Sequence, residues 1–298
     1  PSTLMQSVAD RLFRWQILPS RVSGPVLGAV WERRDALRDY DVIVATATPI
    51  ANAIGALRAV GLVKAPVIGI HCGIVNYRHS WLRRKANGFV LRRMWTQIYG
   101  DGELESIRQQ FGVRGDRVAV NQFGVDTSFW SPDGSMDGGY ILSVGTDARR
   151  DYELLAEAAR RIPERFVVVT SRKIEGGVPP NVEIRKGDWH AETLSDEELR
   201  SLYRGASLVA LPLKDSAQPS GQSVCLQAMA CGKPVVLTDT RGLWSRDMMR
   251  DGENVVLVPH GDADALVRAI RRVMDDPEER KRIGGCAQET AVAEGSIE

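Results

Sequence analysis

Apolar runs of four to six residues alternate with longer segments in which apolar positions recur at helical spacing. In the first half, this pattern predicts strands at 41–45, 66–70 and 117–121 and helices at 52–60 and 104–111. Short continuous apolar runs are typical of strands buried on both faces, and intervening helices make consecutive strands parallel. The first half is therefore predicted to form a parallel sheet covered by helices.

The alternation restarts after the segment DTSFWSPDGSMDGG at 126–139, which has the composition of a linker. We place a boundary within it and predict two domains, residues 1–133 and 134–298. Ser195 is suited to cap a helix. Ligands bind beyond the carboxyl ends of parallel strands, so the cleft between the two domains is the expected site. The second domain is predicted to contain strands at 140–144, 166–170, 182–185, 208–213, 234–238 and 255–258, and helices at 152–161, 196–205, 222–231 and 262–275.

Composition narrows the class of protein. The chain has 298 residues, of which 43% are hydrophobic and 26% charged, as in soluble globular proteins. We expect neither a membrane-spanning segment nor a secretory signal. The four cysteines are far apart and form no CxxC pair, which predicts reduced thiols in a cytoplasmic protein without a zinc site: Cys72, Cys225, Cys231 and Cys286.

The small net charge of +1 conceals an asymmetry between the halves. Residues 1–130 hold 17 Lys and Arg against 10 Asp and Glu, whereas the remainder holds 22 against 28. Opposite charges on the two halves indicate modules with different partners.

Residues 208–239 carry the most specific chemical pattern. A buried strand leads into a polar loop, and a helix opens near Gly221. The first turn of a helix has unpaired N–H groups and a positive dipole end, which suit a phosphate or sugar hydroxyls. Gly221 allows a ligand to approach the backbone closely. The stretch therefore predicts a phosphate or sugar site.

The same stretch contains AMACGKPVV at 228–236, followed by Arg241-Gly242, DGEN at 251–254 and VVLVPHGDADAL at 255–266. Upstream lie QFGVDTSFWSP at 122–132 and YILSVGTDARRDYELLAE at 140–157. Over about residues 40–290, the chain resembles the retaining GT-B glycosyltransferases of family 4, also called glycosyltransferase group 1. The resemblance is more specific in the second half than in the first.

This resemblance implies an α/β protein of the GT-B architecture, with two Rossmann-like domains facing each other across a cleft and the donor site in the second. It implies a hexosyltransferase that moves a hexose from a UDP- or GDP-sugar to a hydroxyl acceptor with retention of configuration. No metal ion and no other cofactor is expected, because basic residues and a helix end neutralise the departing diphosphate.

The donor motif departs from the family at two positions. The family usually has two glutamates eight residues apart, and the matching positions here are Pro219 and Gln227. We expect Gln227 to hydrogen-bond a ribose hydroxyl through its amide. The turn Ser220-Gly221-Gln222-Ser223 is expected to hold the donor sugar with backbone N–H groups and the Gln222 amide. Asp215 is the candidate for the missing acid.

A second implied donor site is the turn that begins at Gly145. The family has a basic residue here against the diphosphate, and Arg149 and Arg150 are the candidates, with Arg150 favoured. The alternative is two solvated arginines at a helix start. Lys173 is a secondary phosphate candidate. Trp189 is expected either to stack on the base or to be a structural tryptophan.

His71 follows a strand, as does a histidine that contacts the donor sugar in the family. It is expected to orient that sugar or to handle the acceptor proton, unless it is structural, and His79 is the substitute candidate. With Arg150 and Gln222, His71 completes the predicted catalytic set.

Residues 76–95 contain six basic residues, no acidic residue and several large apolar ones. A basic helix with aromatic residues predicts contact with an anionic membrane surface, which would place the protein on the inner face of the membrane with a lipid or lipid-linked acceptor. The alternative is a solvated helix face; nucleic-acid binding is the least favoured reading. The residues of the predicted surface are Arg78, Trp81, Arg83, Arg84, Lys85, Arg92 and Arg93.

Two further functions stay open. One is a non-catalytic partner subunit that binds nucleotide sugars, favoured by Pro219 and Gln227. The other is a nucleotide-sugar 2-epimerase, which needs carboxylates in the cleft as proton carriers. We also expect the chain, which begins with Pro rather than Met, to lack the family's first strand with its Gly-rich loop and its final crossover helix.

Overall fold

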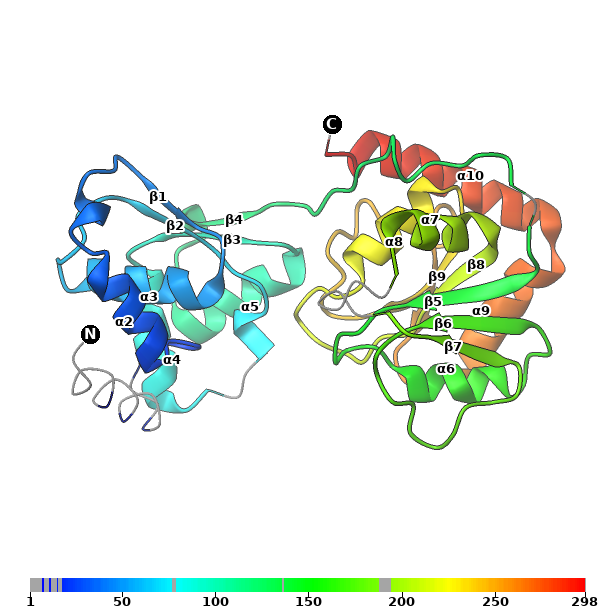
Figure 1. Cartoon of the computed structure of the whole chain (residues 1–298), viewed down its shortest axis with the longest axis horizontal. Helices are drawn as coiled ribbons and strands as arrows, with labels where there is room; N and C mark the ends of the chain where they lie inside the picture. The colour runs from blue at the N-terminus through cyan, green and yellow to red at the C-terminus, as the bar shows by residue number, and fades with distance from the viewer. Residues whose placement is uncertain are drawn as a thin grey trace. The chain divides into compact units, whose positions relative to one another are not determined.

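A computed structural model of the chain describes residues 7, 11, 15, 18–76, 79–135, 137–187 and 194–297. Its contacts divide the chain into two units (Figure 1). The first unit is Pro1–Asn121 with Ala217–Pro219, and the second is Gln122–Ser216 with Ser220–Glu298. The division falls ahead of the predicted boundary after residue 133, because Trp130 packs edge-on against Tyr203 in the core of the second unit.

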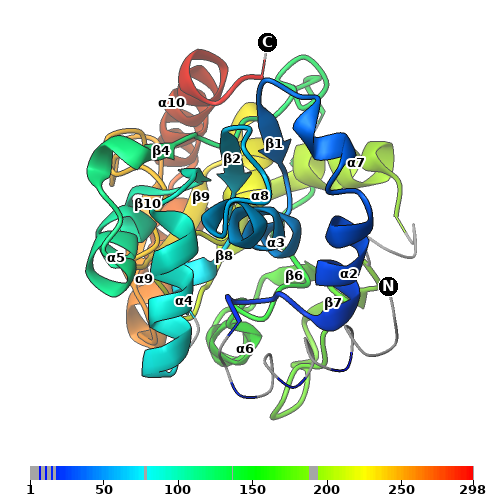
Figure 2. The same cartoon turned by 90° about the vertical axis from the view of Figure 1, so that its left-hand side faces the viewer.

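The first unit is built on a parallel sheet of four strands in the order β1-β2-β3-β4. The strands are β1 (Ile43–Ala45), β2 (Val67–Ile70), β3 (Trp95–Ile98) and β4 (Val118–Val120). The helices are α2 (Gly24–Glu32), α3 (Thr48–Ala59), α4 (Trp81–Leu91) and α5 (Asp101–Phe111), and the 3-10 turns are η1 (Ala36–Arg38), η2 (Ile74–Asn76) and η3 (Gly115–Arg117). In Figure 2, α3 lies between α2 and α4, both of which it contacts.

Alternate residues of the first sheet point into the core. Ile43 and Val67 are buried with α3, whereas Val44 on the opposite face of β1 is 55% exposed. The structure confirms the three strands predicted in this unit. It adds β3, whose sequence Trp-Thr-Gln-Ile has no continuous apolar run and so escapes the pattern.

The second unit is built on a parallel sheet of six strands in the order β10-β9-β8-β5-β6-β7. The strands are β5 (Tyr140–Val144), β6 (Arg165–Val169), β7 (Val182–Arg185), β8 (Ala206–Leu211), β9 (Val235–Asp239) and β10 (Val256–Pro259). The helices are α6 (Tyr152–Ala159), α7 (Asp196–Gly205), α8 (Gln222–Ala230), α9 (Ala263–Asp275) and α10 (Pro277–Glu294).

Helices cover both faces of the second sheet. The side chains of α6 and α9 pack around Ile141 of β5, and those of α7 and α8 pack around Leu142 on the other face. Figure 1 shows α7 and α8 on the side of the sheet away from α6. Burial on both faces explains why all five residues of β5 and all six of β8 are buried, and why both strands are apolar runs in the sequence.

Every strand and helix predicted in the second unit is confirmed, with shifts of one or two residues at the ends, and Ser195 caps α7 as expected. The helix α10 was not predicted. Its buried positions Ile283, Ala287 and Ala291 recur at every fourth residue, but two of them are alanines and give a weak apolar signal. No helix within the described part of the chain is both long and apolar enough to cross a bilayer.

The order of the second sheet reverses at β5. The chain leaves β5 for β6 on one side, whereas β8 pairs with the other side of β5. In open parallel sheets, such a reversal opens a crevice at the carboxyl ends of the two strands, where ligands bind. Here those ends lead to Gly145 and to the loop before α8.

Candidate functional site

The loop after β5 is tied to the loop after β8. The N–H of Asp151 donates to the carbonyl of Pro212 over 2.9 Å, and Arg150 forms an isolated bridge with Leu213. Asp151 also caps α6, since its Oδ1 accepts from the N–H of Leu154 at 3.2 Å. These contacts fix Arg150 at the reversal point of the sheet.

The guanidinium of Arg150 is buried between two glycines, and the residue is only 3% exposed. Gly145 has φ +147° and Gly221 has φ +80°, a region that residues with a side chain rarely adopt. A Cβ on Gly145 would overlap Nε of Arg150, and a Cβ on Gly221 would lie 2.7 Å from its Nη1. The two glycines therefore provide the room that the arginine occupies.

The buried charge of Arg150 is incompletely matched. Its Nε lies 3.4 Å from Oδ2 of Asp147, beyond normal hydrogen-bond length. Neither Nε nor Nη1 has a hydrogen-bond partner among the described residues. A guanidinium keeps its charge inside a protein, so burial does not neutralise it. A fixed buried cation with unused donors is a site for an anion.

The helix α8 begins beside this guanidinium. Gly221 is its N-cap, and no side chain caps the helix. Gln222 and Ser223 in the first turn are half-buried, and Ser220 just before it donates its hydroxyl to Oδ1 of Asp147 at 3.0 Å. The positive end of the helix and the guanidinium thus favour negative charge at the same place.

Two buried hydroxyl groups hold the carbonyl of Gly145. Tyr152 donates to it over 2.6 Å and Thr170 over 2.8 Å. Burial raises the pKa of Tyr152, so its hydroxyl stays protonated as a donor. Neither residue was predicted, because the contact depends on how three strand ends and a helix meet. The conformation of Gly145 is fixed by these bonds.

Gln227 faces the interior of the second unit. It is 7% exposed, and its Oε1 accepts from the hydroxyl of Tyr203 at 3.1 Å. Burial also raises the pKa of Tyr203 well above its usual value. The amide oxygen of Gln227 is therefore already engaged. Its second lone pair and the amide nitrogen stay available, and the predicted bond to a ribose hydroxyl stays a prediction.

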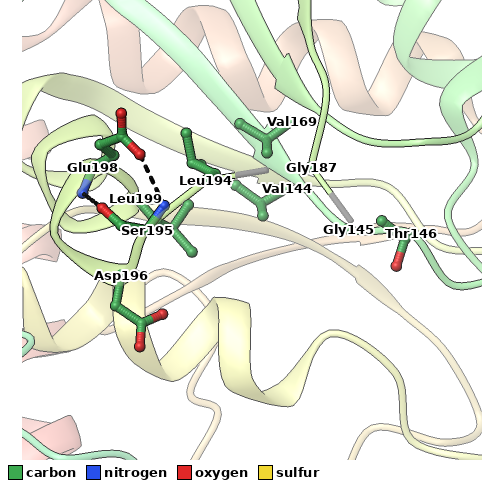
Figure 3. A pocket seen from close by; sticks show the side chains of 10 residues that line it. All are labelled: Val144, Gly145, Thr146, Val169, Gly187, Leu194, Ser195, Asp196, Glu198 and Leu199. Carbon is green, nitrogen blue, oxygen red and sulfur yellow. Dashed lines mark hydrogen bonds between the residues drawn. The ribbon is translucent and has the colours of Figure 1, made fainter. Parts of the chain in front are cut away.

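A cavity of about 540 Å³ opens next to the arginine loop (Figure 3). Gly145 and Thr146 belong both to its lining and to the loop that carries Arg150. On the opposite wall, Ser195 and Glu198 form a reciprocal capping box at the start of α7. The other described lining residues are Val144, Val169, Gly187, Leu194, Asp196 and Leu199.

The remaining donor-site predictions fare differently. The backbone of Arg149 donates to Asp147 at 2.9 Å and accepts from Lys214 at 2.8 Å, which confines it to the same loop. The side chain of Lys173 is 84% exposed and lies 3.8 Å from Glu175. Trp189 lies outside the described residues.

Asp215, the candidate acid, is paired with an arginine. Its carboxylate accepts from the backbone N–H of Arg241 at 3.1 Å and from Nε of Arg241 at 2.8 Å. Partial burial acts to raise the pKa of Asp215, but the bonds from Arg241 outweigh it and leave that pKa below its usual value. Asp215 is therefore ionised at neutral pH, and its role in place of a family glutamate stays a prediction.

In the first unit, His71 lies at the carboxyl end of β2 and is fully buried. Burial lowers the pKa of its imidazole to about 4, so the ring is neutral at physiological pH. Neither ring nitrogen has a hydrogen-bond partner among the described residues. The substitute candidate His79 is tied to the backbone, since its Nε2 lies 3.0 Å from the carbonyl oxygen of Ile74.

Glu103 is a buried acid at the same sheet edge that was not predicted. It is fully buried in the first turn of α5, and burial raises the pKa of its carboxyl to about 7. Its Oε1 accepts from the backbone N–H of Gly73 at 3.2 Å, two residues after His71. Glu103 shares a helix face with the buried Ile107 and Phe111, and an acid on that apolar face was the available signal.

The basic helix is α4, and its outer side combines aromatic and cationic groups. Trp81 is 63% exposed and Phe89 is 40% exposed. The Lys85 amine lies 5.9 Å from the ring centre of Trp81, and the Arg93 guanidinium 3.9 Å from that of Phe89. We call the exposed residues Trp81, Leu82, Arg84, Lys85, Phe89, Arg92 and Arg93 the α4 surface. Arg83 is half-buried instead, and Arg78 lies outside the described residues.

The second unit matches a known protein family. Residues 138–276 match the family model described as glycosyl transferases group 1. The chain is 28% identical over 198 residues to the lipopolysaccharide core biosynthesis glycosyltransferase LpsE of Rhizobium meliloti, covering 63% of this chain and 53% of that protein. It is 29% identical to the MMP alpha-(1->4)-mannosyltransferase of Mycolicibacterium hassiacum, covering 71% and 54%. The chain spans about half the length of these curated relatives.

Solved structures establish the fold. The sucrose-phosphate synthase of Thermosynechococcus elongatus matches with a TM-score of 0.74 at 19% identity, covering 92% of this chain and 73% of that one. HepE of Anabaena in complex with UDP also matches with a TM-score of 0.74, at 17% identity, covering 94% and 80%. The chain therefore has the GT-B architecture that its sequence predicts.

Proposed function

We propose that this chain, whose residues 138–276 form a glycosyl transferases group 1 domain, transfers a hexose from a UDP- or GDP-sugar to a hydroxyl acceptor with retention of configuration. The observation that carries the proposal is the buried Arg150 at the reversal point of the second sheet, with two donor nitrogens lacking partners among the described residues. A diphosphate supplies the charge and the acceptor oxygens that this guanidinium lacks.

The cavity beside Gly145 extends the proposal to the rest of the nucleotide. Gly145 and Thr146 connect it to the arginine loop, so a nucleoside in the cavity carries its phosphates toward Arg150 and the start of α8. Its lining combines apolar side chains with the carboxylates of Asp196 and Glu198, which can accept hydrogen bonds from base N–H groups or ribose hydroxyls. The related fold of HepE, which was crystallised with UDP and with UDP-glucose, supports a uridine nucleotide.

In the proposed reaction, the bond between the anomeric carbon and the diphosphate oxygen breaks, and a bond to the acceptor oxygen forms on the same face. The acceptor proton passes to the departing diphosphate. Arg150 and the backbone N–H groups at the start of α8 stabilise the charge that grows on this leaving group. The fixed cation does the work that a metal ion would otherwise do, and we therefore propose a metal-independent transferase.

The first experiment measures melting temperature with UDP, GDP, ADP and TDP, because a ligand that binds only the folded state raises it. We expect UDP or GDP to give the largest rise. Turnover is then measured as release of that nucleotide from its hexose donor over a panel of hydroxyl acceptors, with and without EDTA, and the anomeric configuration of the product by NMR. A protein that none of the four nucleotides stabilises overturns the proposal.

A second candidate function is nucleotide-sugar binding without catalysis. It is favoured by Gln227, which stands where the family has a glutamate and whose amide oxygen is engaged by Tyr203. In that case UDP or GDP stabilises the protein, but no acceptor is glycosylated and no epimerised sugar is formed. The same turnover assay therefore separates the two functions.

We further propose that the α4 surface contacts an anionic bilayer and that the acceptor is a lipid or lipid-linked sugar. Exposed aromatic rings and cations on one helix side fit the boundary between headgroups and acyl chains. Each cation near such a surface contributes about 1 kcal/mol.

Sedimentation with vesicles of phosphatidylcholine alone or with anionic phosphatidylglycerol tests this surface. We expect binding only with the anionic lipid. Replacing Arg84 and Lys85 by Glu should abolish it, and Trp81→Ala should weaken it several-fold. Tyr40→Ala is the matched control, because Tyr40 is 60% exposed in the same unit but outside α4. Equal binding to both kinds of vesicle overturns the proposal.

A further inference from the structure

The carboxylate of Asp147 occupies the mouth of the arginine site. Its Oδ1 accepts from the backbone N–H of Arg149 at 2.9 Å and from the hydroxyl of Ser220 at 3.0 Å. Its Oδ2 lies 3.4 Å from Nε of Arg150. The side chain is 45% exposed, so solvent also reaches it.

This set of partners is the one that a phosphate oxygen uses: a guanidinium, a hydroxyl and a backbone N–H. Asp147 supplies one negative charge to Arg150, but it leaves Nε and Nη1 of the guanidinium without a normal hydrogen bond within the described part of the chain. Charge-assisted bonds between arginine and an anion are usually about 2.7–2.9 Å long and often paired. The observed contact is longer and single, so it is weak enough for a better anion to displace.

We propose that Asp147 is an internal substitute for the donor phosphate, which holds the site when it is empty and must be displaced when the diphosphate binds. This inference rests on the proposed function, because it takes the diphosphate to bind at Arg150. It assigns a role in setting anion affinity to a residue of the loop that the family resemblance leaves without one.

Displacement makes the charge of the ligand decisive. A neutral nucleoside gains nothing from Arg150 and leaves Asp147 in place. A diphosphate brings more charge than one carboxylate and can form the paired bonds that Asp147 does not. Asp147 therefore lowers the affinity for every anion that has to displace it, because its own negative charge stays near the site, and it leaves the affinity for a neutral nucleoside unchanged.

A purely structural role predicts the opposite sign. If Asp147 served only to hold Arg150 in its place for the ligand, removing its charge would weaken both the empty protein and nucleotide binding. As a substitute anion, it stabilises only the empty protein. Loss of its charge should then lower the melting temperature of the empty protein and raise its affinity for a diphosphate.

The experiment compares wild type with Asp147→Asn and Asp147→Ala by calorimetry, with UDP, inorganic pyrophosphate and uridine as ligands. Asn keeps an oxygen for the N–H of Arg149 and the hydroxyl of Ser220 and removes only the charge. We expect both variants to bind UDP and pyrophosphate about three- to tenfold more tightly, and uridine with unchanged affinity. Melting of the ligand-free proteins is measured alongside, to show that the variants are folded.

Asp151→Asn is the matched control. It removes the same charge from the same loop, and Asn still caps α6. We expect it to change UDP affinity less than twofold. If wild type binds UDP and Asp147→Asn binds it equally or more weakly, the inference about Asp147 is overturned and the donor site stands. If wild type binds neither UDP nor pyrophosphate, the proposed donor site itself falls, and the inference with it.

Discussion

Polar side chains are buried at the carboxyl edges of both parallel sheets, but they lose their charge at one edge and keep it at the other. At the edge of the first sheet, His71 and Glu103 are buried, and burial moves the pKa of His71 to about 4 and that of Glu103 to about 7. At the edge of the second sheet, Arg150 is buried to the same degree, but a guanidinium keeps its charge at any physiological pH.

The difference favours an anion at the second edge over the first. Imidazole and carboxyl groups shed their charge when water is excluded, so the first edge can exist without a counter-ion. Arg150 cannot lose its charge in this way, and Asp147, with Oδ2 3.4 Å from Nε of Arg150, compensates that charge only in part. An anion therefore has more to gain at the second edge, and that is where the glycosyltransferase domain is matched.

Replacing Arg150 is the strongest way to break this comparison. Arg150→Ala removes a charge of the site that burial cannot neutralise, and we expect UDP affinity to fall a hundredfold or more and turnover to fall by an order of magnitude or more. Arg150→Lys keeps the charge but not the paired donors, so its UDP affinity should lie between those of wild type and Arg150→Ala. Calorimetry measures the affinity. Unchanged binding by Arg150→Ala would remove this residue from the site.

The charge of Glu103 is the corresponding test at the first edge. The folded-state pKa of Glu103 is about 7, above the value of 4.5 for an exposed carboxyl. The unfolded chain therefore ionises first, and stability is lost as pH rises from about 4.5 to 7. Glu103→Gln should stabilise the first unit by about 2–3 kcal/mol at pH 8 and have little effect at pH 4.5.

Denaturant unfolding between pH 4.5 and 8 measures this effect. Glu105→Gln is the control, because Glu105 is on the same helix, with its side chain in an exposed bond to Gln109. A stabilisation by Glu103→Gln that is equal at both ends of the pH range would show that ionisation of Glu103 is not its cause.

The sequence predicts this architecture well where burial alone decides the structure. The run at 140–144 coincides with β5, and the segment at 196–205 coincides with α7, because continuous apolar residues and a capped amphipathic pattern are local signals. It fails at β3 and α10. There, a polar strand and small buried alanines are fixed by neighbours that no local window contains.

The candidate site, too, is predictable only where local sequence carries the signal. Arg150 and Gly221 follow from the motif and from the physical requirements of a phosphate site. The partners of Gln227 and Arg150 do not, since Tyr203 precedes Gln227 by 24 residues, and the glycine Gly221 is far along the chain from Arg150. Which side chain uses up the bonding capacity of another depends on the folded arrangement, so Asp147 and Glu103 emerged only from the structure.

Replacing Gly221 tests the packing around Arg150 and should have a smaller effect than replacing Arg150 itself. Gly221→Ala combines a positive φ with a Cβ 2.7 Å from Nη1 of Arg150. We expect a loss of about 1–2 kcal/mol in the stability of the second unit and about tenfold weaker UDP binding. Gly285→Ala in α10 is the control, since its Cβ would meet open space and should stabilise the helix slightly. A Gly221→Ala variant with wild-type UDP affinity would contradict the close packing against Arg150.

The smallest expected effect concerns a cation outside the buried site. Lys173 follows β6, but its side chain is 84% exposed and lies 3.8 Å from Glu175, so water and salt screen its charge. We expect Lys173→Ala to weaken UDP binding by no more than about twofold at low salt, and this difference to vanish at about 0.5 M salt, where the screening length is only a few ångströms. Calorimetry at the two salt concentrations measures it, and Glu175→Gln, which frees Lys173 from its partner, should shift the affinity slightly in the opposite direction. A loss of tenfold or more that persists in high salt would place Lys173 in direct contact with the phosphates, and Arg150 would then not be the only cation on which the second edge depends.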